Sequence, residues 1–200
     1  MLPAPETLFA GSIPFAAALI STGTVALAEI GDKTQLLALL LAARFRRPWP
    51  IIAGILVATL LNHALAAWVG AVAAQWLRPE VLRWVVAASF LGVALWTLKP
   101  DSIDDDARLP ARGAFIATTL AFFVAEIGDK TQVATVLLAT RYTPLWEVIA
   151  GTTLGMLLAN VPVVLLGSRF ADRLPLKAAR YVAAAVFALL AGWVAWRGIG

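Results

Sequence analysis

Six long apolar segments constrain the fold of this chain more than any other feature of its sequence. They run at about residues 12–42, 50–76, 80–98, 113–140, 146–168 and 178–197, and charged residues or prolines stand between them. A transmembrane helix needs about 20 mostly apolar residues. The segments therefore predict an all-α membrane protein with six transmembrane helices.

The composition excludes several classes of protein. The chain is 61% hydrophobic and only 14% charged, whereas soluble domains carry about 25% charged residues. With no cysteine and a single histidine, His63, it lacks the ligands for a cysteine zinc cluster or a multi-histidine metal site. The net charge of +4 comes from basic residues near segment ends, so we ascribe it to membrane topology and expect no nucleic-acid partner.

The basic residues also predict an orientation. Connections after the first, third and fifth segments are richer in lysine and arginine than the other three regions, and the richer side is expected to be cytoplasmic. Both termini are then predicted to lie outside, and the acidic stretch 99–112 inside. The richer side carries Arg44, Arg46, Arg47, Lys99, Arg108, Arg112, Arg169, Arg173, Lys177 and Arg180, against Arg78, Arg83, Arg141 and Arg197 on the other.

The sequence contains an internal repeat. The eight residues from Ala28 to Gln35, AEIGDKTQ, recur unchanged from Ala125 to Gln132, an offset of 97 residues. The same offset pairs Phe90 with Phe187. We therefore divide the chain into a first three-helix repeat (1–98), a short acidic cytoplasmic loop (99–112) and a second three-helix repeat (113–200).

Because each repeat crosses the membrane three times, the second copy begins on the opposite face from the first. Two inverted three-helix repeats of this kind are typical of secondary transporters, whose sites lie near the bilayer midplane where the repeats meet. A duplicated scaffold with no transport role is the alternative reading.

The repeated motif places charged residues near the middle of two apolar segments. Each charge at the bilayer centre costs about 2.5–3.5 kcal/mol, so such residues must face one another, water or a bound ion. A purely structural alternative is a Glu–Lys salt bridge between residues four apart on one helix. The charged residues are Glu29, Asp32 and Lys33 in the first copy and Glu126, Asp129 and Lys130 in the second.

Four carboxylates with neighbouring amide and hydroxyl oxygens form a set of hard ligands that suits magnesium, calcium or manganese(II). Four carboxylates and two lysines leave a formal charge of −2, which one divalent cation neutralises. When the cation leaves, protons must replace it, and this is the basis of cation/proton exchange. Gly31 and Gly128 are expected to loosen the helix and expose main-chain oxygens as further ligands.

At this motif the sequence resembles the GDT family, in which Glu-x-Gly-Asp-Lys-Thr stands once in each half of a six-span protein. The family includes Golgi manganese/calcium–proton antiporters, chloroplast manganese transporters and bacterial manganese exporters. The resemblance covers nearly the whole chain and implies divalent-cation/proton antiport, with the acidic motif residues binding the cation. By this resemblance the ligands are Glu29, Asp32, Glu126 and Asp129, and the match extends to Lys33, Lys130, Thr34, Thr131, Gln35 and Gln132.

We therefore expect a transporter, not an enzyme, that exports Mn2+ or, as second choice, Ca2+ in exchange for protons. The threonines, glutamines and main-chain oxygens complete the metal site, and the lysines tune its charge. We expect no prosthetic group, a lipid bilayer as surroundings, the bacterial inner membrane as location, and rocking of one repeat against the other. Whether the protein forms a homodimer stays open.

Five further polar residues are candidates for supporting roles. They lie within the apolar segments, where polar side chains usually face the helix bundle. His63 either relays protons or makes an interhelical hydrogen bond. The candidates are Thr22, Thr119, Asn62, His63 and Asn160.

Two other functions stay open at this stage. An intramembrane aspartyl hydrolase would use Asp32 and Asp129 as a pair of carboxylates sharing one proton. A passive cation channel would use the same acidic residues without coupling to protons.

Overall fold

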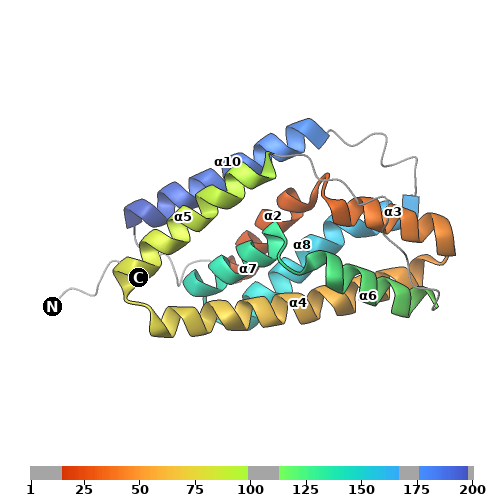
Figure 1. Cartoon of the computed structure of the whole chain (residues 1–200), viewed down its shortest axis with the longest axis horizontal. Helices are drawn as coiled ribbons and strands as arrows, with labels where there is room; N and C mark the ends of the chain where they lie inside the picture. The colour runs from red at the N-terminus through yellow and green to blue at the C-terminus, as the bar shows by residue number, and fades with distance from the viewer. Residues whose placement is uncertain (1–14, 99–112, 167–175, 198–200) are drawn as a thin grey trace.

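The computed structural model describes residues 15–98, 113–166 and 176–197, and within these ranges all regular structure is helical. Figure 1 shows the helices gathered into one elongated bundle. The expected loop 99–112 lies outside the described residues. The helices are α2 (Ala16–Glu29), α3 (Lys33–Phe45), α4 (Pro48–Trp76), α5 (Pro79–Thr97), α6 (Ala114–Glu126), α7 (Lys130–Arg141), α8 (Leu145–Leu166) and α10 (Leu176–Arg197).

Three of the described helices are long and apolar enough to cross a membrane. They are α4, α8 and residues Pro79–Trp96 of α5. Shorter apolar helices cover Ala16–Glu29, Ala114–Glu126 and Ala184–Arg197. The described residues are thus helical as expected, and the apolar helices are consistent with a membrane protein.

The first and fourth apolar segments are each divided into two helices at the repeated motif. α2 ends at Glu29 and α3 begins at Lys33, while α6 ends at Glu126 and α7 begins at Lys130. Gly31 and Gly128 have φ angles of 82° and 74°, a backbone conformation that glycine adopts without steric penalty. The expected loosening of the helix at these glycines is confirmed.

The long middle helix of each half packs on the broken segment of the other half: α4 on α6 and α7, and α8 on α2 and α3. Glycines make this approach close. A methyl group added at Gly54 would lie 2.8 Å from Thr118 Cβ, and one added at Gly151 would lie 2.9 Å from Ser21 Cβ. These two contacts join residues related by the same offset of 97, so the sequence repeat is also a repeat of contacts.

The last helices of the two halves, α5 and α10, pack against each other along one side of the bundle (Figure 1). The rings of Phe90 and Phe187 stack with centroids 6.2 Å apart, and the Arg83 guanidinium donates to the main-chain carbonyl of Ala195. Since Phe90 and Phe187 are equivalent residues of the two repeats, the pair is centred where the halves meet.

Candidate metal centre

Each broken segment is stabilised by residues of its own motif. The Asp32 side chain caps α3 by accepting from the Thr34 main-chain N–H at 3.4 Å, and Asp129 caps α7 in the same way through Thr131 at 3.5 Å. An aspartate at this position satisfies one of the N–H groups that a helix start leaves without a partner.

The glutamines at the ends of the two motifs cap the glycine turns. The Gln35 side-chain oxygen accepts from the Gly31 N–H at 2.8 Å, and Gln132 accepts from Gly128 at 2.7 Å. The sequence EIGDKTQ therefore encodes the break and also supplies its hydrogen-bond partners. This explains why the turn can form in a segment that is otherwise apolar.

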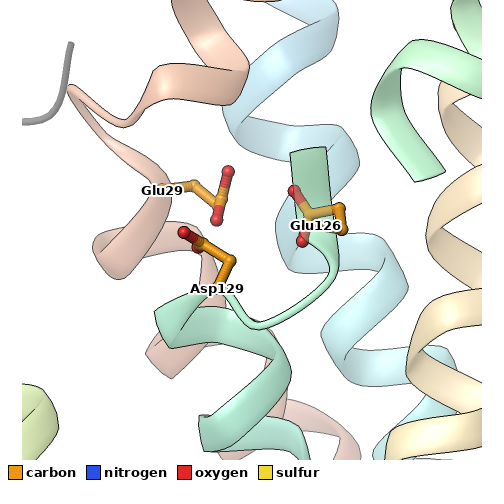
Figure 2. A group of neighbouring side chains, drawn as sticks. All are labelled: Glu29, Glu126 and Asp129. Atoms are coloured by element: carbon orange, nitrogen blue, oxygen red, sulfur yellow. The ribbon is translucent and has the colours of Figure 1, made fainter. Parts of the chain in front are cut away.

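Carboxylates from both halves converge at these breaks. Glu29, Glu126 and Asp129 each offer one oxygen, and these oxygens all lie within 4.8 Å of one another (Figure 2). All three side chains are buried. Three buried carboxylates this close repel one another when all are ionised, so the group is suited to hold a cation or protons.

The two glutamates each keep one carboxylate oxygen unused. The Thr34 hydroxyl donates to Glu29 Oε2 at 2.5 Å, and the Thr131 hydroxyl donates to Glu126 Oε2 at 3.1 Å. Oε1 of each glutamate is buried and has no hydrogen-bond partner within the described part of the chain. Buried polar atoms rarely lack a hydrogen-bond partner, and these two oxygens are suited to hold a metal ion or a proton.

The lysines bind the aspartates of the opposite repeat. Lys33 Nζ lies 2.9 Å from Asp129 Oδ1, and Lys130 forms an ion pair with Asp32. The salt bridge considered from the sequence, between a glutamate and a lysine of one helix, is thus replaced by two bridges between repeats. Sequence spacing gave no signal for this pairing, because each partner lies about a hundred residues away.

Two neighbouring helices hold the glutamines in place. Gln35 Nε2 donates to the Ala159 carbonyl of α8 at 2.9 Å, and Gln132 Nε2 lies 3.4 Å from Asn62 Oδ1 of α4. Asn62 also donates to the Phe123 carbonyl at 3.1 Å. Of the five supporting candidates, Asn62 is directly connected to a motif residue, and the carbonyls of Ala159 and Phe123 are contacts that sequence reasoning missed.

The other supporting candidates have different surroundings. Thr22 donates to the carbonyls of Ala18 and Gly151, and Thr119 donates to that of Phe115. Asn160 donates to the carbonyl of Met156, and its own side-chain oxygen is buried without a hydrogen-bond partner in the described ranges. His63 is buried, and neither ring nitrogen has such a partner there.

A family model described as "Divalent cation/proton antiporter GDT1" matches the chain twice, over residues 17–105 and 114–200. The chain belongs to the GDT1 family. It is therefore a transporter and not an enzyme, and the family resemblance stated from the doubled motif is confirmed. Each of the two matched stretches contains one copy of the repeated motif.

Two relatives extend this comparison. A protein of Vibrio cholerae named "Putative manganese exporter" is 60% identical to this GDT1 chain over 173 residues, 86% of either protein. A GDT1-like protein of Synechocystis is 27% identical over 190 residues, 84% of this chain and 90% of its own length. No solved structure matches the chain.

Proposed function

We propose that this chain exports a divalent cation, Mn2+ in the first place and Ca2+ in the second, in exchange for protons. The observation that carries the proposal is the group of buried carboxylate oxygens from Glu29, Glu126 and Asp129 within 4.8 Å of one another. Asp32 completes the set of four carboxylates. The name of the Vibrio cholerae relative supports manganese as the first choice.

The proposed site uses the other motif residues to complete and balance the oxygen ligands. Thr34, Thr131, Gln35 and Gln132 hold the carboxylates and the turns, and an amide oxygen that accepts one hydrogen bond keeps a second lone pair for a metal. The four acidic residues and the two lysines carry a formal charge of −2. One divalent cation or two protons neutralise it, so the two cargoes occupy the same oxygens in turn.

We further propose that the chain crosses the bilayer six times as two inverted three-helix repeats, with both termini outside. The broken segments α2–α3 and α6–α7 then form one crossing each. Matching glycine contacts at Gly54 and Gly151 support the inverted relation. The excess of arginine and lysine in the connections after the first, third and fifth segments supports the orientation in an inner membrane.

Metal-dependent proton flux in proteoliposomes tests the function. The protein is reconstituted with a pH-sensitive dye inside, and Mn2+, Ca2+ or Mg2+ is added outside. The variants are Glu29→Gln and Asp129→Asn, which remove one charge each and keep the shape of the side chain. Glu80→Gln, at an exposed position in the first turn of α5, is the matched control.

We expect the flux of the two site variants to fall to that of empty liposomes, and the control to retain it. Unchanged flux in both site variants would remove these residues from the mechanism. Metal uptake that is insensitive to an imposed pH gradient would instead identify a passive channel.

A further inference from the structure

The α5–α10 pair packs on only one end of the broken segments. Within the described part of the chain α10 packs on α2 and α5 packs on α7, and neither packs comparably on α3 or α6 (Figure 1). By the repeat, α2 corresponds to α6, α3 to α7 and α5 to α10. In an exactly symmetric molecule the α10–α2 contact would be matched by one between α5 and α6, and the α5–α7 contact by one between α10 and α3, so the pair breaks the symmetry of the bundle.

Side-chain burial follows the same asymmetry. On α7, Leu137 is 5% exposed and belongs to the apolar cluster that holds the α5–α10 pair, and Val133 packs against that cluster. Their repeat equivalents on α3 are Leu40, 46% exposed, and Leu36, 38% exposed. The same apolar surface is thus covered on α7 and uncovered on α3.

The two ion pairs of the site differ in solvent exposure, and the more exposed pair lies on the side of α3. The Lys33 side chain, which begins α3, is 29% exposed, whereas that of Lys130, which begins α7, is 2% exposed. The centre is therefore more accessible on the side of α3 than on the side of α7. Chain direction puts α3 and α6 at the end of the bundle that bears Arg44, the end expected to be cytoplasmic.

The repeats themselves are poorly suited to move as rigid units. A methyl group added at Gly151 of α8 would overlap the Ala18 carbonyl of α2, and one added at Gly70 of α4 would overlap the Val136 carbonyl of α7. These contacts join one repeat to the other at backbone distance. Rocking of repeat against repeat would break them, whereas movement of α5 and α10 would not.

We propose that the α5–α10 pair is the moving gate of this transporter, and that in a second state it leaves α2 and α7 and docks on α3 and α6. In that state α10 covers Leu36 and Leu40, and α5 packs on α6, as the repeat requires. The present structure is then the state open toward the end of α3 and α6. This inference rests on the proposed exchange function.

Reducible cross-linking tests the two docked states, since the chain has no cysteine of its own. One set of double variants combines Ala87→Cys with Ala134→Cys or Leu137→Cys, all in the cluster that joins α5 to α7. The second set consists of the repeat equivalents, Ala184→Cys with Leu37→Cys or Leu40→Cys. A short methanethiosulfonate cross-linker is applied, and the chain is then cleaved at a protease site inserted in 99–112. The two halves migrate together on a gel only if the cross-link has formed.

We expect the first set to cross-link in metal-free membranes and the second to cross-link during exchange. Either cross-link should reduce exchange at least about tenfold, with recovery on reduction. The gate proposal is overturned if the second set never cross-links while the unmodified chain exchanges metal. It is also overturned if exchange continues after the first set has been cross-linked. If both sets cross-link but the unmodified chain moves no metal against protons, the movement stands and the proposed function fails.

Discussion

Lys33 of the first repeat and Asp129 of the second form an ion pair of 2.9 Å, and its repeat equivalent joins Lys130 to Asp32. The two pairs tie the breaks in α2–α3 and α6–α7 to each other across the centre of the molecule. In the described part of the chain neither lysine forms an ion pair with Glu29 or Glu126, and one carboxylate oxygen of each glutamate has no hydrogen-bond partner. The aspartates thus join the repeats, and the glutamates supply the oxygens most available to a cargo.

The two lysines should differ in their contribution to stability. Lys130→Met removes one partner of a fully buried ion pair, a change that costs about 3–5 kcal/mol. Lys33→Met also leaves a buried aspartate, Asp129, without its partner, but the Lys33 side chain is 29% exposed and water reaches this end of the pair, so we expect a smaller loss than for Lys130→Met. Thermal unfolding of the purified protein in detergent measures both. Equal losses for the two variants would contradict the asymmetry of the site.

The affinity for the cation should rise with pH. Protons and metal compete for the same carboxylate oxygens, so low pH fills the site with protons and weakens metal binding. If two protons leave for each cation, affinity rises about 100-fold per pH unit while the empty site holds both protons. Calorimetric titration in buffers of different ionisation enthalpy counts the protons released. An affinity independent of pH would remove proton competition from the mechanism.

Exchange should carry no net charge across the membrane. The formal charge of −2 from four carboxylates and two lysines is neutralised by one divalent cation or by two protons. A potassium gradient with valinomycin imposes a membrane potential on the proteoliposomes, and the initial rate of metal-driven proton flux is recorded. We expect the rate to be unaffected by the sign of the potential. A strong dependence would show that a different number of protons moves.

Gly128→Ala should destabilise the turn between α6 and α7. The φ angle of Gly128 is 74°, and nothing lies within 4 Å of an added methyl group, so the cost comes from the backbone alone. A residue with a Cβ in this conformation costs about 1–2 kcal/mol. Gly92→Ala is the matched control, in α5 with equally open space. Since each kcal/mol corresponds to about 2–4 °C in a chain of this size, we expect Gly128→Ala to lower the melting temperature accordingly. Gly92→Ala should leave it unchanged or raise it.

Asn62→Ala should weaken metal binding without unfolding the protein. Asn62 donates a hydrogen bond to the Phe123 carbonyl and accepts one from the Gln132 side chain. Its repeat equivalent, Ala159, accepts from Gln35 through its main-chain carbonyl alone. Losing these bonds costs about 1–3 kcal/mol. A double-mutant cycle with Gln132→Ala, read out as metal affinity, isolates the coupling. Additive effects of the two changes would mean that Asn62 does not act through Gln132.

The sequence by itself determined the parts of this protein that depend on local chemistry. Apolar length predicted helices suited to a membrane, the exact repeat of AEIGDKTQ predicted two equivalent units, and the glycines predicted a break in each. These features depend on neighbours a few residues apart, and the structure confirms the helices and the breaks. The same motif sufficed to predict the family.

Only the tertiary structure decided which charged groups meet. Lys33 and Asp129 are 96 residues apart, and a helical projection of one segment cannot place them in contact, because the helix is broken between Glu29 and Lys33. The asymmetry between Leu40 and Leu137 is likewise invisible in two equivalent repeats. It arises because one pair of helices, α5 and α10, cannot pack on both ends of the bundle at once.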